Sequence, residues 1–402
     1  MIVIDIIWTI FQCLVGFHLV WPVILLLIWK ATAQKDQQQT TERPAEPDYA
    51  IIVTAYEQTH TLPAVVSSIL KLNYTNYHIY LVADKCDISD LHFDSQKVSV
   101  LRPEQTLASN TKSHFYAIQR FIRAHNYLTI IDSDNLVQPE LLNEFNQQFS
   151  RGYQAVQGLR EAKNLDTTYA CLDAARDIYY HHYDGKLLFE GGSSATLSGS
   201  GMAFSVQLYR ECLEHRNVEG AGFDKVLQAA IVGRDKRIAF TDSAIVFDEK
   251  TSRSDQLVQQ RSRWINTWFK YFSLGFTLIG KGIKHSSRNQ LLFGITLLRP
   301  PLFIFILLSG FCFLINLWIS PLTSLVWLMA FILFIAGFYI ALAKPATDPR
   351  IYKSLKNIPY FMFYQIQSLL KSRKANQHSV ATKHYHAESI DKLKEQDESR
   401  SL

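Results

Sequence analysis

Residues 127–134 read YLTIIDSD, a short apolar run that ends in two aspartates. The run Tyr127–Ile131 is predicted to be a buried strand. Residues two apart in an extended chain point the same way, so Asp132 and Asp134 can reach one cation. Mg²⁺ and Mn²⁺ prefer oxygen ligands and share them with substrate phosphates. The alternative is an aspartate-rich turn that caps the next helix.

Further strands are predicted upstream, alternating with helices. The strands are Tyr49–Ala55, Ile79–Ala83 and Val98–Leu101, and the helices are Leu62–Leu72 and Ser113–Arg123. This alternation is typical of an α/β domain with a parallel sheet covered on both faces, in which ligands bind at the carboxyl ends of the strands. Those ends carry Thr54, Tyr56, Asp84, Arg102, Asp132 and Asp134. No G-x-G-x-x-G follows the first strand and no P-loop occurs, so a phosphate-bearing ligand would need a metal ion or basic side chains.

Two uncharged blocks are long enough to cross a bilayer. Ile6–Trp29 suffices for one crossing, and Pro300–Ala343, interrupted around Ser320, suffices for two. A cleaved signal peptide is the alternative for the first block. The basic flanks are Lys30, Lys35, Lys281, Lys284, Arg288, Arg299, Lys344 and Arg350. They predict a multi-pass protein of the inner membrane, with its N-terminus outside and its main domain in the cytoplasm.

The composition excludes some other classes. Lys and Arg exceed Asp and Glu by only 41 to 36, so no nucleic-acid-binding surface is expected. The basic excess lies mostly near the apolar blocks, as expected beside anionic membrane lipids. Five cysteines without a C-x-x-C pair indicate free thiols in a reducing compartment.

Three further positions could carry chemistry. Asp84 ends a strand and could accept a hydrogen bond from the imide N–H of a uracil, or serve in a loop. Lys112 could reach a donor phosphate, or be simply solvated. Asp224 follows the glycine-rich residues 220–222 and could take a proton from an attacking hydroxyl, or cap a helix.

Two short motifs follow the first half of the domain. Residues 198–202 read SGSGM, so the backbone at Gly201 could approach a ligand closely or form a turn. Residues 260–264 read QRSRW. Here Arg263 can bind an oxyanion bidentately, Trp264 offers a face to a sugar ring, and Gln260 suits hydroxyls. The alternative for this motif is a basic helix end at a membrane.

Taken together, these motifs resemble glycosyltransferase family 2, specifically its membrane-bound branch related to cellulose, hyaluronan and poly-N-acetylglucosamine synthases. The resemblance runs from about Tyr49 to Tyr271 and keeps the family order. The motifs are residues 82–84 (VAD), 132–134 (DSD), 199–202 (GSGM), 223–224 (FD) and 260–264 (QRSRW).

The resemblance implies a GT-A fold and roles for individual residues. Asp84 would bind uridine, and Lys112 a donor phosphate. Asp132 and Asp134 would lie at the diphosphate and hold Mg²⁺ or Mn²⁺, and Asp224 would be the general base. Gln260, Arg263, Trp264 and Gly201 would hold acceptor and diphosphate, with Arg160 and Lys163 near the acceptor path.

The implied activity is an inverting, metal-dependent transfer from a UDP-sugar to a glycan or lipid-linked acceptor at the cytoplasmic membrane face. A catalytically silent scaffold or a transport component is the alternative. The chain departs from the family where residues 54–58 replace P-x-x-N-E, and where Gly222 and Phe223 precede Asp224 without a carboxylate. Three spans are also fewer than a polymer-conducting channel normally uses.

The predicted organisation has five parts. They are a transmembrane helix (1–33), a GT-A domain (48–255), the QRSRW and interfacial region (256–290), a transmembrane hairpin (297–343), and an interfacial helix with a polar tail (344–402). The interfacial stretches are Trp264–Lys284 and Tyr360–Leu370, and the alternative is a core helix of the soluble domain, which for the second stretch is an equal alternative. Lys383, His384 and His386 resemble a family segment that follows the spans, with no role assigned.

Overall fold

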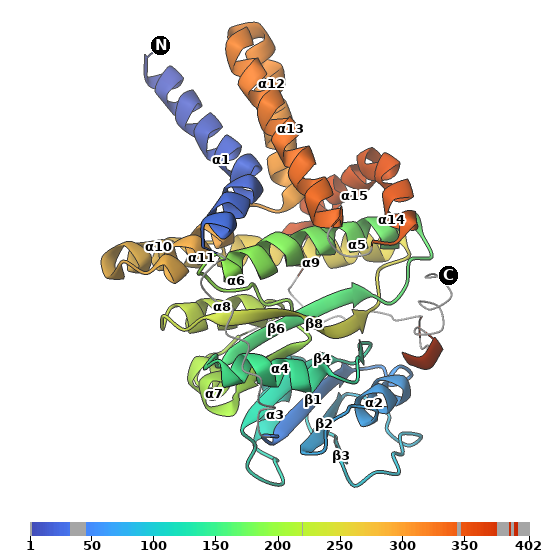
Figure 1. Ribbon diagram of the computed structural model, residues 1–402. Helices are drawn as coiled ribbons and strands as arrows, with labels where there is room; N and C mark the ends of the chain where they lie inside the picture. The colour runs from blue at the N-terminus through green and yellow to red at the C-terminus, as the bar shows by residue number, and fades with distance from the viewer. Residues whose placement is uncertain are drawn as a thin grey trace.

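The computed structural model describes residues 2–32, 46–218, 220–343, 347–375, 386 and 390–392. Most of the predicted linker 34–48 lies outside these residues, as do Lys35, Lys344, Lys383 and His384. An eight-stranded sheet with the order β3-β2-β1-β4-β7-β6-β8-β5 forms the centre of the described chain. Helices cover the sheet, and a helical layer separates it from three long apolar helices (Figure 1).

The first half of the sheet is parallel, as predicted. It contains β1 (Tyr49–Tyr56), β2 (Tyr77–Asp84), β3 (Val98–Leu101) and β4 (Tyr127–Asp132). The register pairs Thr54 with Asp132 and Tyr56 with Asp84. The polar ends of β1, β2 and β4 therefore lie at one edge, which is where the pattern of alternating strands and helices placed a ligand site.

The second half of the sheet corrects the expectation of a purely parallel arrangement. β7 (Met202–Ser205) runs antiparallel to both β4 and β6 (Ala155–Ala162). β8 (Ile238–Asp248) is parallel to β6, and β5 (Leu136–Val137) is antiparallel to β8. Hydrophobic periodicity marks a strand without fixing its direction, so the sequence pattern could not reveal this mixed sheet.

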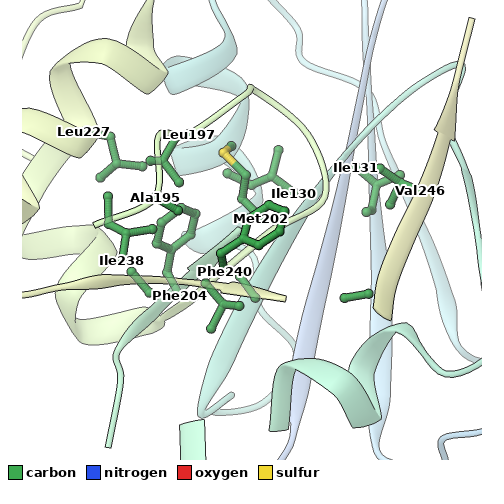
Figure 2. Packing of buried hydrophobic residues seen from close by; sticks show 14 of the residues in the cluster. Ile130, Ile131, Ala195, Leu197, Met202, Phe204, Leu227, Ile238, Phe240 and Val246 are labelled. Atoms are coloured by element: carbon green, nitrogen blue, oxygen red, sulfur yellow. The ribbon is translucent and has the colours of Figure 1, made fainter. Parts of the chain in front are cut away.

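The core lies where the two halves of the sheet meet. Ile130 of β4, Met202 and Phe204 of β7 and Ile238 of β8 are buried together (Figure 2). Leu227 of α8 (Phe223–Val232) is buried in the same cluster. Because α8 is anchored in this core, the position of its first turn is fixed relative to the strand ends.

Shorter helices complete the domain. They are α2 (Leu62–Leu70), α3 (Asn110–Ile118), α4 (Leu141–Ser150) and α7 (Val206–Leu213). α3 begins three residues earlier than predicted, because Ser109 caps it by accepting from the Lys112 N–H, and it ends five residues earlier than predicted.

A helical layer lies between the sheet and the apolar helices (Figure 1). It contains α5 (Thr168–Tyr180), a π-helix (His181–Leu187), α6 (Leu188–Glu190), α9 (Ser254–Tyr271), α10 (Leu274–His285) and α11 (Arg288–Leu298). α10 and α11 pack closely at glycines: a Cβ added to Gly275 would lie 2.7 Å from the Gly294 carbonyl oxygen. The predicted interfacial stretch Trp264–Lys284 covers the end of α9 and most of α10.

Among the described residues, three helices are long and apolar enough to cross a membrane. They are α1 (Ile2–Thr32), α12 (Leu302–Ile319) and α13 (Pro321–Ala343). Their lengths, about 46, 27 and 34 Å at 1.5 Å per residue, are close to or above a hydrocarbon core of about 30 Å. Many outward side chains are apolar, such as Leu14, Trp318 and Leu322. This agrees with the predicted spans and with the predicted interruption near Ser320.

The three helices are joined by polar contacts. Gln12 Oε1 of α1 accepts from Trp327 Nε1 of α13 at 3.0 Å and from Asn316 Nδ2 of α12. In an apolar surrounding, such side-chain hydrogen bonds fix the mutual rotation of helices.

The last helices return to the helical layer. α14 (Pro349–Ser354) packs on α5, and α15 (Ile358–Lys371), joined to α14 by a 3₁₀ turn (Leu355–Asn357), packs on α9. A final 3₁₀ turn is Ser372–Lys374. Tyr360, Phe363 and Leu370 are exposed on α15, so its predicted place along the head-group plane stays a prediction.

Candidate active site

One cavity of about 770 Å³ joins the ends of β1, β2 and β4 to α8 and α9. Its lining includes predicted site residues from four separate segments: Asp84, Asp132, Asp134, Asp224, Gln260, Arg263 and Trp264. A cavity of this size is within the range of small-molecule sites. The structure therefore brings most of the predicted residues to one place.

Asp84 holds a loop at the wall of the cavity. Its two carboxylate oxygens accept from the backbone N–H groups of Leu107 (2.9 Å) and Ala108 (2.7 Å), and the side chain is 2% exposed. Ala108 has a φ of +46°, a conformation that costs energy for a residue with a side chain. The two charge-assisted hydrogen bonds stabilise this loop, and each oxygen keeps a further lone pair.

The segment Asp132–Asn135 is fixed by a short chain of polar contacts. Ser200 Oγ accepts from the Asp132 N–H (3.0 Å) and donates to the Asn135 side-chain oxygen (2.7 Å). The Asn135 amide nitrogen donates to Asp134 Oδ1 at 3.1 Å. Lys163 Nζ donates to the Asp134 backbone oxygen at 2.9 Å. Contacts with Ser200, Asn135 and Lys163 thus hold the segment that carries the two aspartates.

The donor set of this segment fits a hard cation. Within the described ranges, no three His, Cys, Asp or Glu side chains are grouped as metal ligands. Two carboxylates at a strand end nevertheless match the usual Mg²⁺ or Mn²⁺ arrangement, in which substrate phosphate oxygens and water complete the shell. The residues that would hold such an ion are Asp132 and Asp134.

Asp224 stands in the first turn of α8. The helix is preceded by Gly222, whose φ is +100°. A Cβ at Gly222 would lie 2.5 Å from Thr267 Cγ2 and 2.8 Å from Tyr271 Cε2, so α8 and α9 approach closely here. Asp224 lines the cavity, and Lys225 Nζ is 3.3 Å from its Oδ2. Asp224 therefore lies at a helix N-terminus beside a lysine ammonium.

The QRSRW residues lie on α9. Gln260 Oε1 accepts from Thr251 Oγ1 at 3.0 Å. Trp264 is 40% exposed, and the guanidinium carbons of Arg176 and Arg261 lie 4.4 and 4.2 Å from its ring centre. Burial lowers the pKa of Arg263 from its ordinary value, but a guanidinium remains charged near neutral pH.

Three predicted residues lie outside the cavity lining. Lys112 is exposed on α3, and its N–H donates to the cap residue Ser109. Gly201 pairs with the backbone of Ile130 and Gly158, and a Cβ there would meet Val246 at 2.8 Å. Lys163 is buried behind Asp134. In this structure Gly201 and Lys163 support the site from behind.

The family model for glycosyltransferase-like family 2 matches residues 47–267, more than half of the chain. The chain belongs to this family. It is a glycosyltransferase with a GT-A fold. No curated protein matches it in sequence.

One solved structure agrees with the fold of this glycosyltransferase. The mannosyltransferase PcManGT from Pyrobaculum calidifontis, solved in complex with GDP-Man and Mn²⁺, is 13% identical with a TM-score of 0.60. The match covers 91% of this chain and 98% of that one. TarS residues 1–349 from S. aureus, in complex with UDP-GlcNAc, is 11% identical with a TM-score of 0.41, covering 82% and 90%.

The glycosyltransferase also has a network of buried charges, of which the sequence analysis had singled out only Arg160. The network residues are Asp173, Arg176 and Asp177 of α5, Arg160 and Asp248 of the sheet, and Lys250 and Arg261. All seven line the cavity. The spacing of Asp173, Arg176 and Asp177, which places three charges on one face of a partly apolar helix, was the signal that could have revealed it.

Ion pairs join the members of this network. Lys250 Nζ lies 2.7 Å from Asp248 Oδ1 and also pairs with Asp177, and Arg261 pairs with Asp173. Burial opposes ionisation of Asp177, yet the charges of Arg176 and Lys250 hold its pKa below the ordinary value. His181 next to the network is neutral near pH 7, because burial lowers its pKa to about 4.

The cavity of the glycosyltransferase continues beyond this network to the apolar helices. Its far wall is formed by Phe303 and Ile306 of α12, Phe334 and Phe338 of α13, and Ile358 and Met362 of α15. Arg299, whose guanidinium pairs with Asp184 of the π-helix, lies at the border between the polar and apolar walls. The donor-side carboxylates and the membrane-side helices therefore share one cavity.

Proposed function

We propose that this enzyme transfers a sugar, with inversion, from a UDP-sugar to an acceptor hydroxyl at the cytoplasmic face of a membrane. The observation that carries this proposal is the gathering of Asp84, Asp132, Asp134 and Asp224 with the QRSRW helix around one cavity. The complex of the mannosyltransferase with GDP-Man and Mn²⁺ supports a nucleotide-sugar donor and a divalent cation for this fold.

Asp224 would act as the general base. An acceptor hydroxyl bound between α8 and Trp264 would give its proton to the Asp224 carboxylate as its oxygen forms a bond to the anomeric carbon. The bond from that carbon to the phosphate oxygen breaks on the opposite face, and its electron pair leaves with the nucleoside diphosphate. Inversion follows from this single displacement.

The diphosphate would be received by Arg263 and by the segment Asp132–Asp134. The guanidinium of Arg263 lies in the cavity wall and suits bidentate contact with phosphate oxygens. Mg²⁺ or Mn²⁺ held by Asp132 and Asp134 would neutralise charge developing on the leaving group. Asp84 and the loop at Ala108 would contact the base.

The orientation in the membrane is inferred from the basic flanks. Lys30 lies in the last turn of α1, Lys281 and Arg288 precede α12, and Arg350 follows α13. All of these flank the ends of the spans next to the catalytic domain, so the positive-inside tendency supports a cytoplasmic catalytic domain.

The decisive experiment is the variant Asp224→Asn. We expect sugar transfer to fall by about 10²–10⁴-fold, the usual contribution of a general base, with donor affinity retained. Detergent-purified enzyme would be given UDP- and GDP-sugars, with nucleotide release and equilibrium donor binding measured. Asp242→Asn, at an exposed aspartate of β8 paired with Lys186, is the matched control. A near-full rate in Asp224→Asn would show that another group takes the proton.

Metal removal tests the role of Asp132 and Asp134. Chelation with EDTA should abolish nucleotide release, and added Mn²⁺ or Mg²⁺ should restore it, because the leaving diphosphate then regains its counter-charge. Asp134→Asn should require a higher Mn²⁺ concentration for half-maximal rate. Unchanged turnover in EDTA would contradict the metal requirement.

A further inference from the structure

The membrane side of the cavity has the chemistry of a binding site for an amphiphile. Six apolar side chains line it: Phe303, Ile306, Phe334, Phe338, Ile358 and Met362. Four of them belong to helices long and apolar enough to cross a membrane. This wall is continuous with the wall that carries Asp224, so one ligand can contact both.

Two buried arginines of the cavity lining have incomplete hydrogen bonding. Arg261 is 3% exposed and pairs with Asp173 through Nη2, but its Nε and Nη1 have no hydrogen-bond partner among the described residues. Arg299 is 5% exposed and pairs with Asp184 through Nη2, while its Nη1 has no partner in the described chain. Both line the cavity.

Buried N–H groups of a charged side chain are costly when unpaired. A ligand with anionic oxygens beside Arg261 and Arg299 would accept hydrogen bonds from these N–H groups. Phosphate suits guanidinium groups because several oxygens can accept at once. The apolar wall beyond the arginines would then receive a hydrocarbon chain, whose burial is favourable by about 0.8 kcal/mol per CH₂.

We propose that the acceptor is a phosphate-bearing membrane lipid. Its hydrocarbon chain lies against α12, α13 and α15, its phosphate contacts Arg261 and Arg299, and a hydroxyl of its head group faces Asp224. This rests on the proposed function and selects a lipid over a free glycan as acceptor. The transfer step is unchanged: the hydroxyl oxygen bonds to the anomeric carbon, its proton passes to Asp224, and the diphosphate leaves with the electron pair.

Binding of three probes separates the parts of this proposal. Farnesyl diphosphate carries a chain and a phosphate group, farnesol carries the chain alone, and inorganic diphosphate carries the phosphate alone. Enzyme in nanodiscs, saturated with UDP, GDP and Mn²⁺ so that the donor side is filled, would be analysed by native mass spectrometry. We expect farnesyl diphosphate to bind at least about tenfold more tightly than either other probe, since each extra 1.4 kcal/mol is tenfold.

Two variants test the walls separately. Ile306→Trp narrows the apolar wall, and the double variant Asp173→Asn with Arg261→Gln removes the cation without leaving a buried carboxylate unpaired. Each should weaken farnesyl diphosphate binding at least about tenfold. Leu317→Trp is the matched control, because Leu317 lies on the same helix and is 48% exposed.

The outcomes are distinguishable. Equal binding of farnesol and farnesyl diphosphate would overturn the phosphate assignment. Absence of binding by both, in an enzyme that binds a nucleotide-sugar and releases nucleotide with a soluble oligosaccharide, would overturn the lipid acceptor and leave the proposed function intact. An enzyme that binds no nucleotide-sugar would instead overturn the proposed function.

Discussion

The donor side and the membrane side of the cavity are held together by different forces. On the donor side, backbone groups hold the charged residues: Asp84 accepts from two N–H groups, and Lys163 donates to the Asp134 backbone oxygen. On the membrane side, charges hold each other across distant segments, as in Asp184 with Arg299. The first kind of site is built by local chain geometry, and the second requires the whole fold.

This difference predicts how each side of the cavity responds to a substitution. A backbone-held carboxylate keeps its partners when a distant residue changes. A buried ion pair instead leaves an uncompensated charge when one member is lost. We therefore expect that removing a single charge on the membrane side lowers the free energy of unfolding more than it lowers the rate of sugar transfer.

The largest stability effect is expected for Arg299→Met. It would leave the Asp184 carboxylate buried without its cation, at a cost of about 3–5 kcal/mol in unfolding free energy. The double variant Asp184→Asn with Arg299→Met should recover more than half of this loss. Thermal unfolding of detergent-solubilised protein, followed by intrinsic fluorescence, measures both. Equal losses in the single and double variants would show that packing rather than charge pairing matters here.

Gly222→Ala should have an intermediate effect, at the contact between the two sides. The new Cβ would clash with Thr267 and Tyr271, and the φ of +100° would strain alanine, together costing about 1–3 kcal/mol. Gly199→Ala is the control, because Gly199 has a φ of +93° but nothing within 4 Å of its added Cβ. Unfolding midpoints that fall equally in both variants would assign the effect to backbone strain alone.

Near neutral pH the smallest effect is expected at His114 on the donor side, where the free energy of unfolding depends on pH only in acid. The ring is buried against Phe223, its Nδ1 is 2.7 Å from the Tyr209 hydroxyl, and burial lowers its pKa from 6.5 to about 3. The unfolded chain therefore takes up a proton at a higher pH than the folded one. Its contribution to stability is full above pH 6.5 and is lost as the pH falls toward 3, by about 1.4 kcal/mol per pH unit.

His114→Asn should flatten this dependence, because asparagine can keep the contact with Tyr209 without titrating. Unfolding free energies between about pH 4 and 7 provide the measurement. His215→Asn, at an exposed histidine, should keep the wild-type slope. A slope unchanged in His114→Asn would show that other groups dominate the acid response.

Much of the donor side could be predicted because strand ends are local features. Asp84 and Asp132 were placed by the apolar runs before them, and the register Tyr56 with Asp84 and Thr54 with Asp132 brings them together. The three spans could be predicted for a similar reason, since about 20 consecutive apolar residues identify a membrane-length helix.

The membrane side could not be predicted in this way. Asp173 and Arg261 are 88 residues apart, and Asp184 and Arg299 are 115 apart. Nothing in the local pattern pairs them, and an isolated charge on a helix usually indicates a solvated face. Lys112 is a position where the prediction from residue type is not supported. A lysine suggested contact with a phosphate, but in the structure Lys112 lies on α3 outside the cavity lining.

By itself, then, the sequence determined the order of motifs, the parallel half of the sheet and the apolar spans, because each depends on residues close together in the chain. Only the tertiary structure decided the direction of β7, the pairing of the buried charges and the continuity of the cavity from Asp132 to Phe334. These depend on contacts between distant segments, which are selected by burial of the whole chain and not by any one stretch of it.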